Sequence, residues 1–167
     1  MADYFLDLLS SYRTKGALVD ANLLLVYFVG SYDPTQITKF KRTRTYTEDD
    51  FYLLASIIVS FSKIVTTPNV LTEVGGLSNQ LPESVRQSYY SEFARRVDTL
   101  DEHFIESRRV SLSAHFTRFG LTDSGIVELV KDKYLVITDD LRLASYCQNI
   151  GIDVINFNNI RTLNWNP

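Results

Sequence analysis

The sequence predicts an α/β fold, a three-layer α/β/α sandwich around a central parallel sheet of four to five strands. Short apolar runs, rich in β-branched residues, alternate along the chain with longer segments that carry apolar residues at helical spacing. This alternation is typical of a parallel sheet with crossover helices on both faces. The length of 167 residues matches one domain, so we expect residues 1–167 to form a single domain.

The predicted strands are the short apolar runs that end next to polar residues. Four are well marked, and the fifth is expected to be short. They cover residues 17–19, 63–66, 134–137 and 152–157, with the short one near 109–112.

Helix starts are marked by capping residues. Thr47, with acidic residues directly after it, resembles a capping box. Thr67 and Pro68 form a strong start, because proline suits the first helical position. Asn22 is suited to cap a helix, and Gly120 to close one. The predicted helices cover residues 2–13, 22–29, 34–40, 47–59, 67–77, 82–104, 111–118, 123–131 and 141–149.

Composition and charge exclude some classes of protein. The net charge is −3, whereas a general nucleic-acid coat protein would have a strongly basic surface. A nuclease is compatible with this negative net charge, since an acidic metal site lowers the net charge. Cys147 is the single cysteine, so no intramolecular disulfide can form. No apolar run reaches the ~20 residues that span a bilayer, so we expect a cytoplasmic protein with no membrane partner.

Acidic residues fall where parallel strands and their helices begin or end. Asp20 follows the first strand, and Asp139 and Asp140 follow the strand at 134–137. Glu73 lies on the second turn of the helix after the second strand, and Asp123 on the first turn of another helix. Because ligands of open parallel sheets bind outside the carboxyl ends of the strands, we expect these acids to converge there.

Converging carboxylates repel one another and raise each other's pKa, which a hard divalent cation relieves. Mg²⁺ prefers oxygen ligands and usually keeps several waters. A ligand set of carboxylates without Cys or His favours Mg²⁺ or Mn²⁺ over Zn²⁺. Such ions activate water for the hydrolysis of phosphodiesters. The acids therefore predict a Mg²⁺ or Mn²⁺ site.

Four segments resemble the motifs of the PIN-domain family, in the same order and context. They are residues 17–24 (ALVDANLL), 67–74 (TPNVLTEV), 121–126 (LTDSGI) and 136–143 (VITDDLRL). The first resembles the opening strand and the second the helix with the family's Glu. The others resemble the third acidic motif and the final Thr-x-Asp motif. The match covers about residues 17–157.

The resemblance implies a metal-dependent endoribonuclease that cuts RNA, often as the toxin of a VapC-type toxin–antitoxin pair. An antitoxin protein as partner and a homodimer are implied as well. The implied metal ligands and catalytic residues are Asp20, Glu73, Asp123 and Asp140.

The final motif leaves one free residue after Thr138, so Asp140 matches the ligand position better than Asp139, which stays an alternative. Asn22, Ser124 and Thr138 are implied to orient carboxylates or waters around the ligands.

Two segments depart from the compact toxins of this family: a helix at residues 1–15 and a longer, basic excursion at 31–46. Tyr32 and Tyr46, in this excursion, are candidates for stacking on unpaired bases. Its basic side chains either bind RNA phosphates or belong to an ordinary solvated loop. They are Lys39, Lys41, Arg42 and Arg44.

Two other classes of function stay open. The first is a non-catalytic PIN-like module that binds RNA or serves as a scaffold, although a scaffold would not need four acids. The second is a receiver-like switch phosphorylated on aspartate. That class needs a lysine at a strand end, and Thr138, Asp139 and Asn158 stand at the last two.

Overall fold

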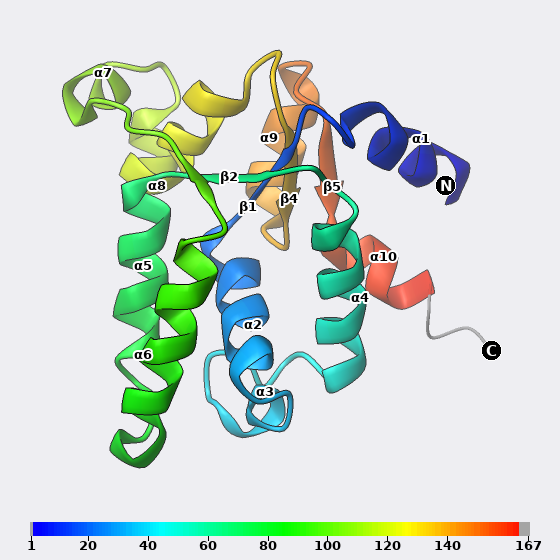
Figure 1. Cartoon of the computed structure of the whole chain (residues 1–167). Coiled ribbons are helices and arrows are strands. Elements are labelled where there is room, and N and C mark those ends of the chain that lie inside the picture. Colours follow the sequence, from blue (N-terminus) through cyan, green and yellow to red (C-terminus); the bar gives the residue numbers. More distant parts are fainter. Residues whose placement is uncertain (1, 164–167) are drawn as a thin grey trace.

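The centre of the molecule is a five-stranded sheet in which every strand pair is parallel. The computed structural model describes residues 2–163 (Figure 1). The strand order is β3-β2-β1-β4-β5. The strands are β1 (Ala17–Val19), β2 (Ile64–Thr66), β3 (Asp101–Glu102), β4 (Leu135–Thr138) and β5 (Val154–Asn156).

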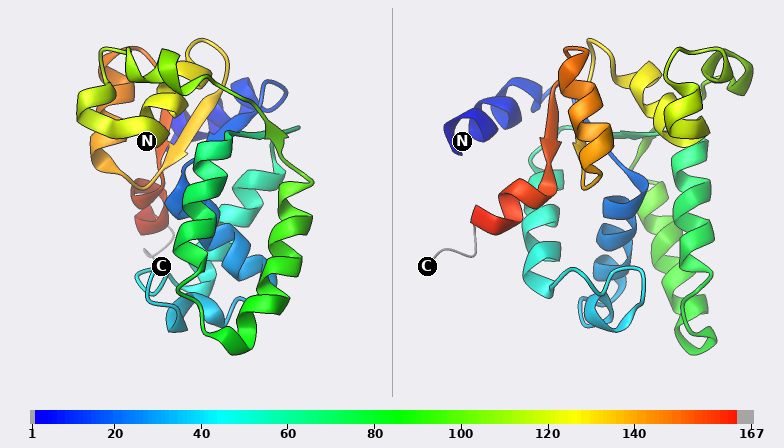
Figure 2. Two further views of the ribbon diagram at one scale, coloured as in Figure 1. Left: turned by 90° about the vertical axis from the view of Figure 1, so that its left-hand side faces the viewer. Right: turned by 180° about the vertical axis from the view of Figure 1, so that it is seen from behind.

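Helices lie on both faces of this sheet (Figure 2), which confirms the predicted α/β/α class. The apolar α2 is almost entirely buried and contacts α4, α5, α6 and β4, whereas α9 contacts β4 and β5. In residues 2–163 the helices are α1 (Ala2–Tyr12), α2 (Ala21–Tyr32), α3 (Gln36–Lys39), α4 (Glu48–Val59), α5 (Pro68–Ser78), α6 (Glu83–Val97), α7 (Ser107–Ser111), α8 (Phe116–Val130), α9 (Leu141–Asn149) and α10 (Phe157–Leu163).

The strand order reverses between β1 and β4, and this reversal places the candidate site. From β1 the chain proceeds outward to β2 and β3, and later to β4 and β5 on the other side. Val19 is paired with Ile137, so Asp20 and Thr138 lie next to each other at the carboxyl ends. Crevices at such switch points are where open α/β sheets bind ligands.

The capping signals read from the sequence are mostly confirmed. Thr47 forms a capping box with Asp50 at the start of α4, and the Thr67 side chain caps α5 with Pro68 in its first turn. The prediction for α2 was wrong, because Asp20 rather than Asn22 is its cap. Asp20 accepts the N–H of Leu23 at 2.9 Å, so α2 begins directly at the end of β1.

The predicted helix at 82–104 begins as expected but is too long, and the predicted strand near 109–112 is wrong. Helix α6 ends at Val97, and the fifth strand is β3, which pairs with β2. Its residues, Asp101 and Glu102, have low strand propensity, and pairing with the sheet edge overrides that preference. The segment near 109–112 lies instead in and just after α7.

The region from 107 to 130 also differs from the prediction. The expected helix at 111–118 is absent from the described chain, and α7 and the start of α8 take its place. Gly120 does close a helical turn as expected, because its φ of 71° interrupts α8. Residues other than glycine rarely adopt such a φ.

Helix α10 was not predicted, and two contacts hold it against the rest of the fold. Arg161 forms an ion pair of 2.7 Å with the buried carboxylate of Asp50 on α4. The same guanidinium lies over the Tyr46 ring, 4.7 Å from its centre. These contacts fix the end of the excursion against α4 and α10.

The predicted N-terminal helix and the predicted short helix in the excursion at residues 31–46 are both present. Helix α1 packs beside β5, with Leu8 buried and the Tyr12 hydroxyl donating to Asp153 at 2.8 Å. The excursion contains α3, as expected, and is anchored by Ile37 and Phe40 in the core. The predicted limits of the domain, residues 1 and 167, lie outside the described residues.

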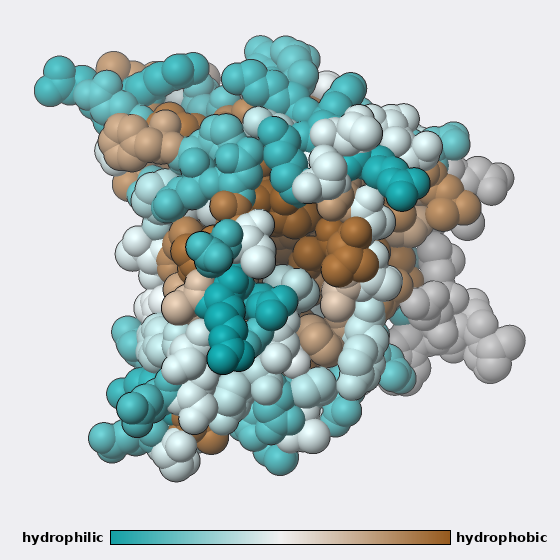
Figure 3. Space-filling view, viewed as in Figure 1, coloured by the Kyte–Doolittle hydropathy of each residue, from teal (hydrophilic) through white to brown (hydrophobic). Residues whose placement is uncertain are grey.

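Apolar residues gather around a hollow in the middle of the face drawn in Figure 3. A cavity of about 210 Å³ is lined there by side chains that include Leu24, Val59 and Leu100. It shares no lining residue with the acidic site. Among residues 2–163 the helices are too short or too polar to cross a bilayer.

The contact between α2 and α4 predicts opposite effects of two glycine substitutions. A Cβ at Gly30 would lie 2.2 Å from the Phe51 ring, whereas one at Gly76 in α5 would meet nothing within 4 Å. We expect Gly30→Ala to lower the free energy of unfolding by about 1–3 kcal/mol through overpacking. Gly76→Ala should raise it by up to ~1 kcal/mol through helix propensity. Urea unfolding measures both, and a Gly30→Ala protein as stable as the wild type would contradict this packing.

Candidate functional site

The four predicted acids line one small cavity at the carboxyl end of the sheet. Its volume is about 90 Å³, and Asn22, Ala21 and Leu143 complete its wall. Asp20 and Asp140 directly precede α2 and α9, whereas Glu73 lies on the second turn of α5 and Asp123 in the middle of α8. The lining acids are Asp20, Glu73, Asp123 and Asp140.

Asp20 is the most firmly held of these acids. It is 5% exposed and caps α2. Its Oδ2 accepts the Thr138 hydroxyl in a very short hydrogen bond and the backbone N–H of Asp139 at 3.1 Å. One carboxylate therefore joins the ends of β1 and β4 to the start of α2.

Burial and neighbouring charge act on the protonation of two acids. Burial, followed by the negative charge of Asp139, raises the pKa of Asp20 from 3.8 to about 8. Burial raises the pKa of Asp123 to about 6, with further upward contributions from Glu73 and Asp140. Arg142 acts in the opposite direction on Asp123. The acids thus influence one another, as expected of carboxylates that share one cavity.

Asp139 and Asp140 lie on different sides of the site. Asp140 lines the cavity and caps α9, accepting the N–H groups of Arg142 at 2.6 Å and Leu143 at 3.2 Å. The Asp139 carboxylate does not line the cavity. It accepts the Tyr46 hydroxyl in a very short hydrogen bond and Asn22 Nδ2 at 3.4 Å. This placement supports Asp140 as the ligand, which remains a prediction.

The three residues expected to support the ligands have different surroundings. Thr138 is fully buried; its hydroxyl donates to Asp20 and accepts the N–H of Asp140 at 2.9 Å. Asn22 lines the cavity. Ser124 is buried, and its hydroxyl has no hydrogen-bond partner within residues 2–163. Thr138 therefore positions two acids at once.

The donor set fits a hard divalent cation in kind, because it consists of carboxylates and an amide oxygen. In residues 2–163, however, no three His, Cys, Asp or Glu side chains are already gathered as a metal site. Glu73 lines the cavity but is exposed, so its side chain is able to rotate within the site. Asp20 and Asp140 are instead fixed by their capping bonds.

Two exposed arginines, one on α8 and one on α9, were missed in the sequence. The Arg118 guanidinium lies over Phe119 and Tyr146, with its carbon 5.0 and 5.6 Å from the ring centres. Arg142 lies 5.9 Å from the centre of Phe119 and donates to the carbonyl of Arg118 at 3.4 Å. Neither makes an ion pair with an acid of residues 2–163. Only the packing of α8 on α9 brings them together.

The part of the excursion that contains α3 lies away from the acids, whereas its last residue, Tyr46, contacts Asp139. Helix α3 is at the far end of α2 from Asp20 (Figure 1). Since α2 has 12 residues, about 18 Å of helix axis separates them. Lys39, Lys41, Arg42 and Arg44 are all exposed.

Of the two tyrosines considered for base stacking, Tyr46 is unsuited, because it is 5% exposed and its hydroxyl is bound to Asp139. Burial, and then the charge of Asp139, raise its pKa. Tyr32 is partly buried and packs edge-on against Tyr89.

Comparison of the chain with protein-family models, with curated proteins and with solved structures gave no match.

The raised pKa of Asp20 predicts how stability depends on pH when divalent ions are removed with EDTA. Because the folded protein binds this proton more tightly than the unfolded chain does, the free energy of unfolding should fall as pH rises from 3.8 to about 8. Asp20→Asn, which stays neutral, should have a shallower slope. Asp49→Asn, at an exposed position on α4, is the control. Urea unfolding at a series of pH values measures the free energy of unfolding of all three proteins. An equal dependence on pH in wild type and Asp20→Asn would contradict the raised pKa of Asp20.

Proposed function

We propose that this protein is a PIN-like endoribonuclease that depends on Mg²⁺ or Mn²⁺ and hydrolyses RNA phosphodiester bonds. The observation that carries the proposal is the convergence of four acids from four helices on one cavity at the switch point of the sheet. Carboxylates do not crowd together without a compensating charge. The order and context of the four motifs add the resemblance to the family.

Asp20, Glu73, Asp123 and Asp140 would hold the cation, with Asn22 at the edge of the cavity. A bound divalent ion supplies activation of water and neutralisation of charge at the phosphate. Thr138 keeps Asp20 and Asp140 in fixed positions through its hydroxyl.

The two arginines of α8 and α9 would hold the RNA backbone near the acids, since the charge of Arg142 acts on Asp123. Arg118 and Arg142 are exposed cations that rest on aromatic rings, and such guanidinium groups match the geometry of phosphate. They also offset the negative potential of the acids, which would otherwise repel the backbone. The basic side chains of the excursion, about 18 Å along α2, would contact phosphates further along the strand.

An antitoxin protein and a second copy of the chain remain proposed partners on the strength of the resemblance alone. The non-catalytic alternative is favoured by one observation, the lack of a ready-made group of three ligands within residues 2–163. It predicts that the protein binds RNA without cutting it.

Cleavage of total RNA with Mn²⁺, followed by mapping of the cut ends, tests the proposal. We expect activity that EDTA abolishes and that Asp20→Asn or Glu73→Gln lowers by more than about 100-fold, because each removes a charged ligand. Asparagine still caps helices well, so Asp20→Asn should keep the fold, which circular dichroism checks.

Glu83→Gln, at an exposed position on α6, is the matched control and should cut as the wild type does. RNA binding without cleavage would establish the non-catalytic module. Full activity in Asp20→Asn that EDTA still removes would place the metal site elsewhere.

A further inference from the structure

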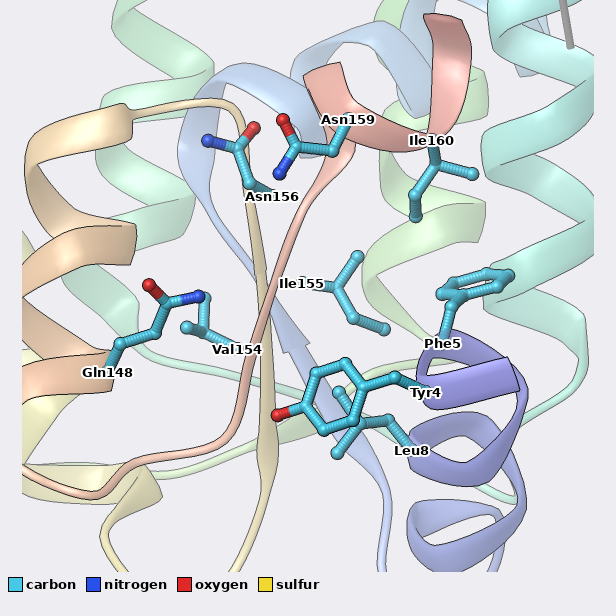
Figure 4. A pocket seen from close by; sticks show the side chains of 9 residues that line it. All are labelled: Tyr4, Phe5, Leu8, Gln148, Val154, Ile155, Asn156, Asn159 and Ile160. Atoms are coloured by element: carbon cyan, nitrogen blue, oxygen red, sulfur yellow. The ribbon is translucent and has the colours of Figure 1, made fainter. Parts of the chain in front are cut away.

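Another pocket, separate from the two cavities described above, lies between α1 and the outer strand β5. Its volume is about 210 Å³, room for roughly seven water molecules at ~30 Å³ each. Figure 4 shows Tyr4, Phe5 and Leu8 of α1 on one side and Ile155 of β5 opposite them. The pocket is too small for a drug-sized ligand but admits a single flat ring system.

Three carboxamides are the polar groups that distinguish this pocket. Asn156 and Asn159 lie together at one end of it, and Gln148 of α9 lies at its side (Figure 4). Every lining residue is uncharged at neutral pH. A ligand of this pocket is therefore neutral, with apolar faces and an edge that bears both donors and acceptors.

Asn156 is the key carboxamide, because it is only 9% exposed. Its Oδ1 accepts the backbone N–H of Asn158 at 3.0 Å. Asn156 lies at the polar end of the pocket (Figure 4), where its carboxamide can also bind a ligand.

The polar end of the pocket adjoins the acidic site. Asn156 is paired with Thr138 across β5 and β4, so it lies at the same carboxyl edge of the sheet. Asn158 donates from Nδ2 to the backbone carbonyl of Asp139 at 2.9 Å. The pocket and the acidic site therefore share the carboxyl edge of β4 and β5.

We propose that the pocket binds one unpaired nucleobase of the RNA substrate, a proposal that rests on the proposed function. The exposed ring of Tyr4 would stack on the base, and the carboxamides would read its edge. Aromatic stacking and carboxamide pairing with base edges are the usual means of recognising single-stranded RNA. An aliphatic peptide side chain would cover the apolar wall but would make no hydrogen bond with the carboxamides that line the pocket.

Binding of free nucleosides tests this pocket without any need for cleavage. Adenosine, guanosine, cytidine and uridine are titrated separately into the full chain in EDTA, and NMR follows the side-chain amide signals of Asn156, Asn159 and Gln148. At least one nucleoside should shift these signals in a saturable way. Tyr4→Ala should weaken that binding about tenfold, the loss expected for one stacked base.

Exposed residues that do not line the pocket supply matched controls. Tyr52→Ala on α4 is paired with Tyr4→Ala, and Asn149→Leu at the end of α9 with Asn159→Leu. Only the pocket variants should weaken nucleoside binding, and Asn159→Leu should also change the base preference next to the cut. The proposal is overturned if no nucleoside shifts the amides, or if the pocket variants bind like their controls.

The two proposals fail in different ways. Asp20→Asn should bind nucleosides as the wild type does, because Asp20 lines a different cavity. Nucleoside binding by a protein that never cuts RNA would leave the base pocket standing and reject the nuclease. Cleavage of RNA without nucleoside binding or base preference would support the nuclease and reject the base pocket.

Discussion

The buried carboxylate of Asp20 is the interaction on which this site depends. It accepts hydrogen bonds from the backbone of Leu23, from the backbone of Asp139 and from the hydroxyl of Thr138, so three elements meet at one side chain. A buried charge is costly unless it is well hydrogen-bonded. These donors lower that cost, yet burial and Asp139 still favour the protonated form. The fold thus holds one acid in a position that a cation would stabilise further.

The surrounding groups divide into rigid and adaptable ones. Asp140 is fixed as the cap of α9, whereas Glu73 is exposed and able to move. Tyr46 binds Asp139 outside the cavity, and the guanidinium of Arg161 lies over the Tyr46 ring. The excursion and α10 therefore help to hold Asp139 in place beside the site. The acidic site is therefore built into the packing of the whole sheet edge.

Features that depend on local pattern could be predicted from the sequence, and features that depend on packing could not. An aspartate after a short buried strand must project at the carboxyl edge, so Asp20 and Asp140 were placed correctly at that edge. Strand β3 consists of Asp101 and Glu102, whose propensities give no sign of a strand. The pairing of Arg118 with Arg142 arises from two helices packed far apart in sequence, and no local pattern marks it.

The position of Mn²⁺ in a crystal of the wild-type protein, located by its anomalous scattering, tests most directly whether the four acids bind a cation. We expect a peak enclosed by Asp20, Glu73, Asp123 and Asp140, with oxygen ligands at ~2 Å, and no peak bound by Asp139 alone. A crystal soaked with saturating Mn²⁺ that holds no ion in this cavity, or holds it only elsewhere, would contradict the claim that these acids converge to bind a cation.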